Sequence, residues 1–183
     1  MIENSISSNL IKAISKAAWL HRTQRRKGSQ RIPYINHPIK VAEYLTRCGF
    51  DDLELLQAAV LHDVIEDTEY TVEEMKVDFG DKVASIVSEI SDDMNLPSSK
   101  RKELQVISAS GLSDEAAKIR IADKTCNISD LLTYELSWSE NRKIAYVDWS
   151  ERVIENIFKP EPCLLEKFKD QVSRARIILA NNS

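Results

Sequence analysis

The sequence predicts an all-α protein, and three observations favour this fold class. Glycine and proline are scarce, with 4 and 5 residues among 183, whereas a turn-rich β architecture needs many more breaks. Apolar residues recur at helical spacing, most clearly over 6–20, and capping residues precede many such segments. A chain of this length can bury a sizeable core. We therefore expect residues 1–183 to form one domain, a bundle of roughly eight to ten helices.

The expected helices follow one another along the whole chain. The first begins near Asn4 or Ser5 as its N-cap, and the basic, polar segment over 22–36 is expected to be a loop. Thr71-Val-Glu-Glu74 is a capping-box pattern, and a polar break over 91–99 separates two later helices. We predict helices over 6–20, 38–48, from 51 or 52 to about 67, 71–80, 81–90, 100–108, 113–134, 139–158 and 161–179.

Composition excludes several classes of protein. The mix of 43% apolar and 30% charged residues is ordinary for a soluble globule, and the net charge of −4 argues against a nucleic-acid binder, so an anion site must be local. The 3 cysteines, Cys48, Cys126 and Cys163, are far apart and predict reduced thiols rather than a disulfide or a zinc framework. Neither a membrane-spanning stretch nor a signal-peptide pattern is evident. We expect a soluble, cytoplasmic protein.

The segment from Leu61 to Thr68 carries the strongest chemical signal. It reads Leu-His-Asp-Val-Ile-Glu-Asp-Thr and follows an apolar run, so its acids end a helix that should be buried. Carboxylates in a core are costly unless they are paired, and a divalent cation is their natural partner. In a continuous helix, four polar side chains of this segment share an arc of roughly 140° and could hold a metal ion and its water: His62, Asp63, Glu66 and Asp67.

A metal ion held by two side chains needs further ligands, and two other segments offer candidates. His37 lies in Pro33-Tyr-Ile-Asn-His-Pro38 just before an expected helix, where its ring can point into a cleft. A capping or packed histidine is the alternative. Asp123 and Asn127 lie four positions apart on one stripe of an expected buried helix, and such polar groups again require a partner. A solvated stripe is the alternative there.

A basic segment precedes His37 in an otherwise acidic chain. Arginine and lysine on a short loop can clamp phosphate, arginine in bidentate fashion, although most basic loops are solvated surface. Its proximity in sequence to His37 favours the phosphate role for Arg22, Arg25, Arg26, Lys27 and Arg31.

Taken together, these segments resemble the RelA/SpoT-type HD hydrolases. The resemblance covers about positions 15–155 and includes spacing as well as residue type. It rests on His21-x-x-Gln24-x-Arg26-Lys27, Pro33-Tyr34-x-x-His37-Pro38-x-x-Val41-Ala42, Leu61-His62-Asp63-x-x-Glu66-Asp67-Thr68 and Ala122-Asp123-Lys124-x-x-Asn127, and it continues through Ser91-Asp92-Asp93 and from Trp138 to Tyr146. Because the chain is too short to include a synthetase or regulatory region, we expect a small stand-alone alarmone hydrolase.

The resemblance implies a role for each matching residue. The positions that match the family's metal ligands are His37, His62, Asp63 and Asp123, and one Mn²⁺ per chain is the expected ion, with Fe²⁺ or Zn²⁺ compatible with the same ligand types. Glu66 and Asp67 match the pair that orients and activates the attacking water. The positions that match contacts to the nucleotide and its phosphates are Arg26, Lys27, Asn127, Arg142 and Tyr146.

The implied reaction removes the 3′-pyrophosphate of guanosine tetra- or pentaphosphate and yields GDP or GTP. Two alternatives stay open: hydrolysis of another phosphorylated nucleotide, such as the 2′-phosphate of NADPH, and a metal-bound nucleotide sensor without turnover. The intact pair Glu66 and Asp67 argues against the sensor. The chain has Met94 and Ser98 where relatives tend to carry lysines, which predicts weaker substrate binding. The sequence leaves open whether the protein forms a homo-oligomer.

Overall fold

The structure, a computed structural model, describes residues 5–181 and is all-α, as predicted. In this part of the chain the only β pairing is an isolated bridge between Arg25 and Pro33, and no helix is both long and apolar enough to cross a membrane. The helices are α1 (Ile6–Leu20), α2 (Asn36–Thr46), α3 (Leu53–Leu61), α4 (Val64–Asp67), α5 (Val72–Phe79), α6 (Asp81–Ile90), α7 (Ser98–Ser108), the short 3₁₀ helix η1 (Ala109–Gly111), α8 (Asp114–Thr133), α9 (Glu140–Glu155) and α10 (Pro162–Asn181).

The helix starts follow the capping chemistry that the sequence predicts. A side-chain oxygen at the N-cap accepts a hydrogen bond from the backbone N–H three residues later, which satisfies one of the free donors of the first turn. Thr71 and Glu74 form the predicted capping box. The alternative first cap, Asn4, lies outside the described residues. The caps with this hydrogen bond include Ser5, Asp52, Ser113 and Ser139.

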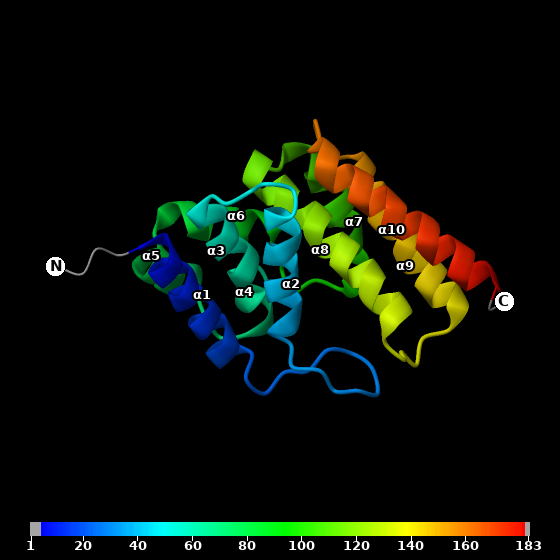
Figure 1. Cartoon of the computed structure of the whole chain (residues 1–183), viewed down its shortest axis with the longest axis horizontal. Helices are drawn as coiled ribbons and strands as arrows, with labels where there is room; N and C mark the ends of the chain where they lie inside the picture. Colours follow the sequence, from blue (N-terminus) through cyan, green and yellow to red (C-terminus); the bar gives the residue numbers. More distant parts are fainter. Residues whose placement is uncertain (1–4, 182–183) are drawn as a thin grey trace.

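Helix α8 runs through the middle of the molecule and positions the site. It packs against α2, α3, α6, α9 and α10, and most of its side chains are buried. Figure 1 shows α1 and α10 on opposite sides, with α2 and α8 between them. A helix that is covered on nearly all sides can hold polar side chains only where other elements supply partners for them.

The loop between α1 and α2 reaches the C-terminal end of α8. The backbone N–H of Ser29 donates to the carbonyl oxygen of Glu135 over 3.2 Å. Gly28 has φ +128°, and a Cβ built on it would lie 3.3 Å from the same carbonyl oxygen. A larger residue would therefore be strained in its backbone and crowded. This contact brings the basic loop over one end of α8.

One sequence prediction about the helices is wrong. The segment that carries His62 is not one continuous helix, because α3 ends at Leu61 and α4 begins at Val64. Asp63 stands between them with φ −98° and ψ −6°, outside ideal helical geometry. The break changes the direction of the side chains that follow it. The predicted common face of four polar groups is therefore divided, because His62, Asp63 and Glu66 line one cavity and Asp67 lines another.

The prediction for the cysteines is also wrong for two of the three. Cys48, in the turn after α2, forms a disulfide with Cys163, in the first turn of α10. The two residues are 115 positions apart, and only the fold brings them together. Cys126 is free and buried in α8, as a reduced thiol was expected to be. The cytoplasmic location, which rested partly on reduced cysteines, stays a prediction.

The disulfide should contribute measurably to stability. Closing a loop of 115 residues removes conformational entropy from the unfolded chain, and such bonds typically contribute about 2–4 kcal/mol. We expect Cys163→Ser to lower the free energy of unfolding by this amount in urea titrations followed by circular dichroism. A thiol reductant should lower the stability of the unmodified chain equally and leave the variant unchanged. Stability that is independent of the reductant in both proteins would contradict the disulfide.

Candidate active site

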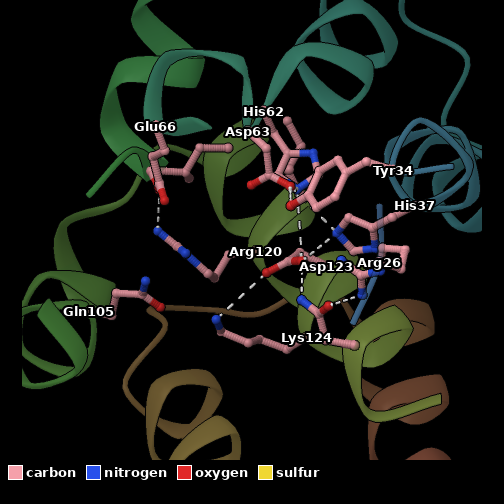
Figure 2. Close-up of a pocket in the computed structure, with 13 residues that line it drawn as sticks. Arg26, Tyr34, His37, His62, Asp63, Glu66, Gln105, Arg120, Asp123 and Lys124 are labelled. Atoms are coloured by element: carbon pink, nitrogen blue, oxygen red, sulfur yellow. Dashed lines mark hydrogen bonds and ion pairs between the residues drawn. The ribbon is translucent and has the colours of Figure 1, made fainter. Parts of the chain in front are cut away.

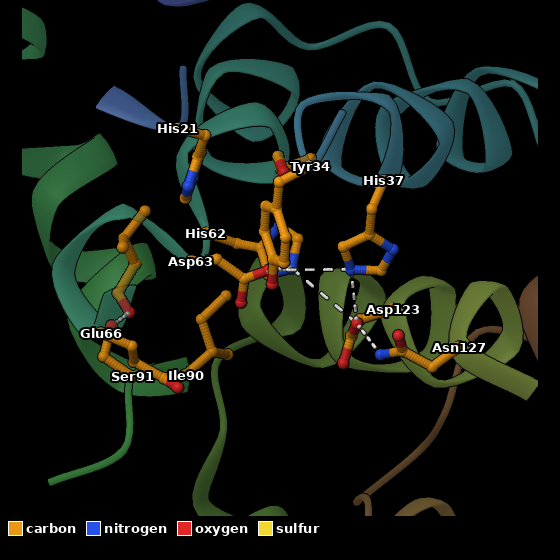
Figure 3. Close-up of polar contacts among 12 residues, drawn as sticks. His21, Tyr34, His37, His62, Asp63, Glu66, Ile90, Ser91, Asp123 and Asn127 are labelled. Carbon is orange, nitrogen blue, oxygen red and sulfur yellow. Dashed lines mark hydrogen bonds and ion pairs between the residues drawn. The ribbon is translucent and has the colours of Figure 1, made fainter. Parts of the chain in front are cut away.

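Two histidines and an aspartate from three different helices converge in the interior. His37 lies in the first turn of α2, His62 directly follows α3, and Asp123 lies in the middle of α8. All three are buried, and one potential ligand atom from each lies within 4.8 Å of the others. Asp63 borders this trio, since its Oδ2 is 3.0 Å from His62 Nε2 and 3.7 Å from His37 Nε2 (Figure 3). The four predicted ligands are thus brought together.

The hydrogen bonding of His62 fits a cation at the centre of this cluster. Its Nδ1 donates to the carbonyl oxygen of Ala59 over 2.8 Å, so the lone pair of the neutral ring is on Nε2, which faces the carboxylates. A lone pair 3.0 Å from a carboxylate oxygen is repelled unless a proton or a metal ion lies between them. Burial disfavours the charged ring, but the carboxylates of Asp63 and Asp123 outweigh it and raise the pKa of His62 to about 9. Carboxylates that stabilise an imidazolium this strongly also suit a divalent ion.

Neighbouring side chains orient the candidate ligands. The hydroxyl of Tyr34 donates to Asp63 Oδ2 over 2.7 Å, and the amide of Asn127 donates to Asp123 Oδ1 over 2.5 Å. Such contacts hold ligating groups in place. Lys124 Nζ is 3.6 Å from Asp123 Oδ2, and burial lowers the pKa of this lysine to about 8.

The four candidate ligands form one wall of a cavity of about 160 Å³ (Figure 2). This is the first of three neighbouring cavities. Glu66 lines the opposite part of this cavity, and its Oε1 accepts a hydrogen bond from the backbone N–H of Asp92 over 2.7 Å. Burial, followed by the nearby charge of Asp63, raises the pKa of Glu66 to about 7. A carboxyl group with this pKa can take up or release a proton near neutral pH.

Asp67 is placed differently from Glu66. It is exposed, and it lines a second cavity of about 280 Å³ rather than the first. Although the residue as a whole is exposed, partial burial of its carboxyl group, followed by the charge of Asp63, raises the pKa of Asp67. Gln24 donates to the backbone carbonyl of Asp67 over 2.6 Å and also contacts Nδ1 of the buried His21. His21 therefore helps to hold the end of α4 and is not one of the candidate metal ligands.

The residues predicted to bind the nucleotide are divided among the three cavities. Arg26 and Asn127 line both the first and the second cavity. Lys27 and Tyr146 line the second and also a third cavity of about 230 Å³. Arg142 lines only the third. All five therefore line either the cavity of the candidate metal centre or a cavity that shares lining residues with it.

Arg26 is partly neutralised by its protein partners. Its Nη2 contacts Asp130 Oδ2 at 2.7 Å and donates to Asn127 Oδ1 over 2.6 Å, while Nε donates to Asp130 Oδ2 over 3.1 Å. Among the described residues, its Nη1 has no hydrogen-bond acceptor. Burial lowers the pKa of Arg26, but Asp130 reverses the effect, so the guanidinium stays charged. Nη1 is the part of Arg26 that could contact a phosphate.

Sequence reasoning missed two cations of the third cavity. Arg101 and Lys102 line it together with Ser98, so α7 supplies positive charge where Ser98 itself does not. The exposed Met94 lies beside Arg101, with 3.2 Å between Sδ and Nη1. No motif marks either cation, because only the packing of α7 against α9 brings them to the site.

Other missed residues carried a signal in the sequence. Arg120 and Lys124 are cations within a helix that otherwise reads as core, and both line the first cavity. Tyr34 is part of a family motif, yet its hydrogen bond to a candidate ligand could not be read from spacing.

Known proteins resemble the chain in sequence and in structure. The sequence model of the HD domain family matches residues 13–147 of this chain. The guanosine-3′,5′-bis(diphosphate) 3′-pyrophosphohydrolase MESH1 of Homo sapiens is 44% identical over 156 residues, which are 84% of this chain and 87% of that protein. The protein of the same name from Drosophila melanogaster is 36% identical over 175 residues, 94% of this chain and 97% of that one. A solved structure described as "A metazoan ortholog of SpoT hydrolyzes ppGpp and plays a role in starvation responses" has a TM-score of 0.87 and 36% identity, and the match covers 92% of this chain and 96% of that chain.

If His62 coordinates an ion, metal binding should release a proton, because the ring must be neutral to bind a metal. The metal-free ring has a pKa of about 9 and is charged below that pH, whereas burial lowers the pKa of His37. The affinity for Mn²⁺ should therefore rise about tenfold per pH unit from about pH 7 to about pH 9 and then level off. Calorimetric titration in buffers of different ionisation enthalpy measures both the affinity and the proton. An affinity that does not depend on pH over this range would contradict the assignment of His62.

Proposed function

This chain belongs to the HD domain family, and we propose that it is a metal-dependent guanosine-3′,5′-bis(diphosphate) 3′-pyrophosphohydrolase. The observation that carries the proposal is the buried cluster of His37, His62 and Asp123, with Asp63 at its border and Glu66 across the same cavity. The names of relatives that match 84% and 94% of the chain support the choice of substrate. The products would be GDP or GTP and pyrophosphate.

We propose that one divalent ion, Mn²⁺, is held by His37, His62, Asp63 and Asp123. Two imidazoles and two carboxylates also suit Fe²⁺ or Zn²⁺. When bound, such an ion supplies a water of lowered pKa and a positive charge beside the phosphoryl oxygens. Tyr34 and Asn127 would keep the two carboxylates in the orientation that the ligand set needs.

We assign proton transfer to Glu66, with Asp67 as its partner beside the second cavity. As water attacks the phosphorus bound to the 3′-oxygen, a new phosphorus–oxygen bond forms and the bond to the 3′-oxygen breaks. The water loses a proton, and the departing 3′-oxygen gains one. Glu66, whose pKa of about 7 leaves much of it ionised at neutral pH, is placed to accept the first proton. Asp67 borders the second cavity, where it can orient the water or the substrate.

The cationic walls of the second and third cavities are assigned to the nucleotide. The guanidinium of Arg142 lies 4.2 Å from the centre of the Trp138 ring, and the ring of Tyr146 lies 5.9 Å from that of Trp138. Lys27 Nζ lies 5.7 Å from Trp138 as well. Positive charge beside aromatic surface matches a ligand that has both phosphates and a base. Arg26, Lys27, Asn127, Arg142 and Tyr146 would therefore bind the substrate.

The experiment that tests the proposal compares two substrates. Initial rates on guanosine tetraphosphate and on NADPH are measured at equal concentration with Mn²⁺, after EDTA treatment and dialysis of the protein. We expect pyrophosphate release from guanosine tetraphosphate to be the faster reaction, lost on chelation and restored best by Mn²⁺. Faster phosphate release from NADPH would show that the substrate is wrong, and full activity in chelated protein would show that the metal role is wrong.

The roles of the two acids can be separated from metal binding. Glu66→Gln and Asp67→Asn should each lower kcat by about 10²-fold or more, the range for loss of a general base, while the bound metal stays at one ion per chain. Metal content is measured on the same samples by mass spectrometry. Glu69→Gln, at an exposed acid of the same segment, is the matched control and should retain full activity. Loss of the metal from the Asp67 variant would instead make Asp67 a ligand.

A further inference from the structure

Gln105, in α7, is a buried amide with a defined orientation. Its exposed fraction is only 9%, and it borders both the first and the third cavity. Its Nε2 lies 2.9 Å from each carboxylate oxygen of Asp92. Carboxylate oxygens only accept hydrogen bonds, so the nitrogen of the amide must face Asp92 and the oxygen must face away.

The oxygen of this amide has no hydrogen-bond donor within the described part of the chain. Gln105 Oε1 is buried, and no side chain or backbone N–H reaches it. A buried acceptor without a donor is costly and calls for an explanation. Figure 2 shows Gln105 at the side of the cavity across from the candidate ligands, beside Arg120 and Glu66. Gln105 is thus part of the wall that a ligand would meet, and its unpartnered oxygen is buried within that wall.

The chemistry of the cavity restricts what can satisfy this oxygen. Phosphate oxygens are acceptors and are repelled by Oε1, so the phosphates must lie toward cations such as Arg26 and Lys124 instead. The partner must be a hydroxyl or an N–H of the ligand. In a nucleotide that is cleaved at its 3′-oxygen, the donor nearest to the reacting phosphorus along the covalent structure is the neighbouring 2′-hydroxyl. The guanine N–H groups lie much farther along the molecule.

We propose, resting on the proposed function, that Gln105 is a specificity-determining residue whose Oε1 accepts a hydrogen bond from the ribose 2′-hydroxyl of the substrate. Asp92 holds the amide so that only its acceptor faces the ligand. A site built around such an acceptor disfavours a ligand that lacks the donor, because the oxygen is then left unpaired. The enzyme would therefore distinguish ribonucleotides from deoxyribonucleotides.

Gln105 also has an indirect connection to Glu66, which the test must separate from direct contact. The backbone N–H of Asp92 donates to Glu66 Oε1 over 2.7 Å, so moving Asp92 could disturb proton transfer. A disturbance of this kind would slow the hydrolysis of every substrate equally. A direct contact to the 2′-hydroxyl affects only the substrate that carries it.

The experiment measures kcat/KM for guanosine tetraphosphate and its 2′-deoxy analogue with Mn²⁺. We expect the unmodified chain to prefer the ribonucleotide by about 10- to 100-fold. Gln105→Met should lower activity on the ribonucleotide, change activity on the deoxy analogue little, and bring the ratio close to one. Gln105→Lys keeps a donor toward Asp92 but lacks the acceptor, and it should lose the preference as well. Gln171→Met, at a similarly buried glutamine that lines none of the three cavities, should keep the preference.

Equal losses on both substrates would overturn the proposal, because they show that Gln105 acts only through Asp92 and Glu66. An unmodified chain without ribose preference would overturn it too. Calorimetric binding of both nucleotides in EDTA gives a second readout that does not need turnover. If neither substrate is hydrolysed, the proposed function fails, and the binding ratio of the unmodified chain and of Gln105→Met still decides whether Gln105 contacts the hydroxyl.

Discussion

The site depends on one electrostatic constraint, the burial of two carboxylates against two imidazoles. Asp123 Oδ1 is 3.1 Å from His37 Nε2 and 3.8 Å from His62 Nε2, and Asp63 Oδ2 is 3.0 Å from His62 Nε2. Such a set of acceptors and lone pairs is unfavourable in a protein interior without positive charge. The cluster therefore requires a proton or a divalent ion. The surrounding helices are arranged so that this positive charge has a single position.

The same constraint applies to α8, which is covered by many neighbouring helices. This helix holds Asp123, and it also holds Arg120 and Lys124, whose charges lie in the same cavity. Lys124 is packed over the ring of Trp149 at 4.1 Å, so α9 helps to bury it. A charged stripe on a buried helix is tolerated because each group has a partner on another element. These buried charged groups give the site a high local charge in a protein whose net charge is only −4.

Local features of the fold were predictable from the sequence, whereas features that arise from packing were not. Capping residues such as Thr71 and Ser113 act within one turn, so they located helix starts correctly. The convergence of His37, His62, Asp63 and Asp123 was expected from a resemblance whose motifs include spacing, and the described geometry agrees with it. The break after Leu61 was not visible, because the apolar run before it and the residues after it both suit a helix. Arg101, Lys102 and the pairing of Cys48 with Cys163 depend on contacts between distant helices, which no local pattern records.

The bond between Cys48 and Cys163 changes the chain from a linear polymer into a closed ring with two tails. Three of the four candidate ligands, His62, Asp63 and Asp123, belong to the ring, while His37 and the basic loop belong to the N-terminal tail. The metal centre is therefore assembled across the junction of ring and tail rather than within one of them. An ion bound by residues of both parts would act as a second, reversible cross-link between the tail and the ring. The disulfide already limits the distance that this cross-link has to span.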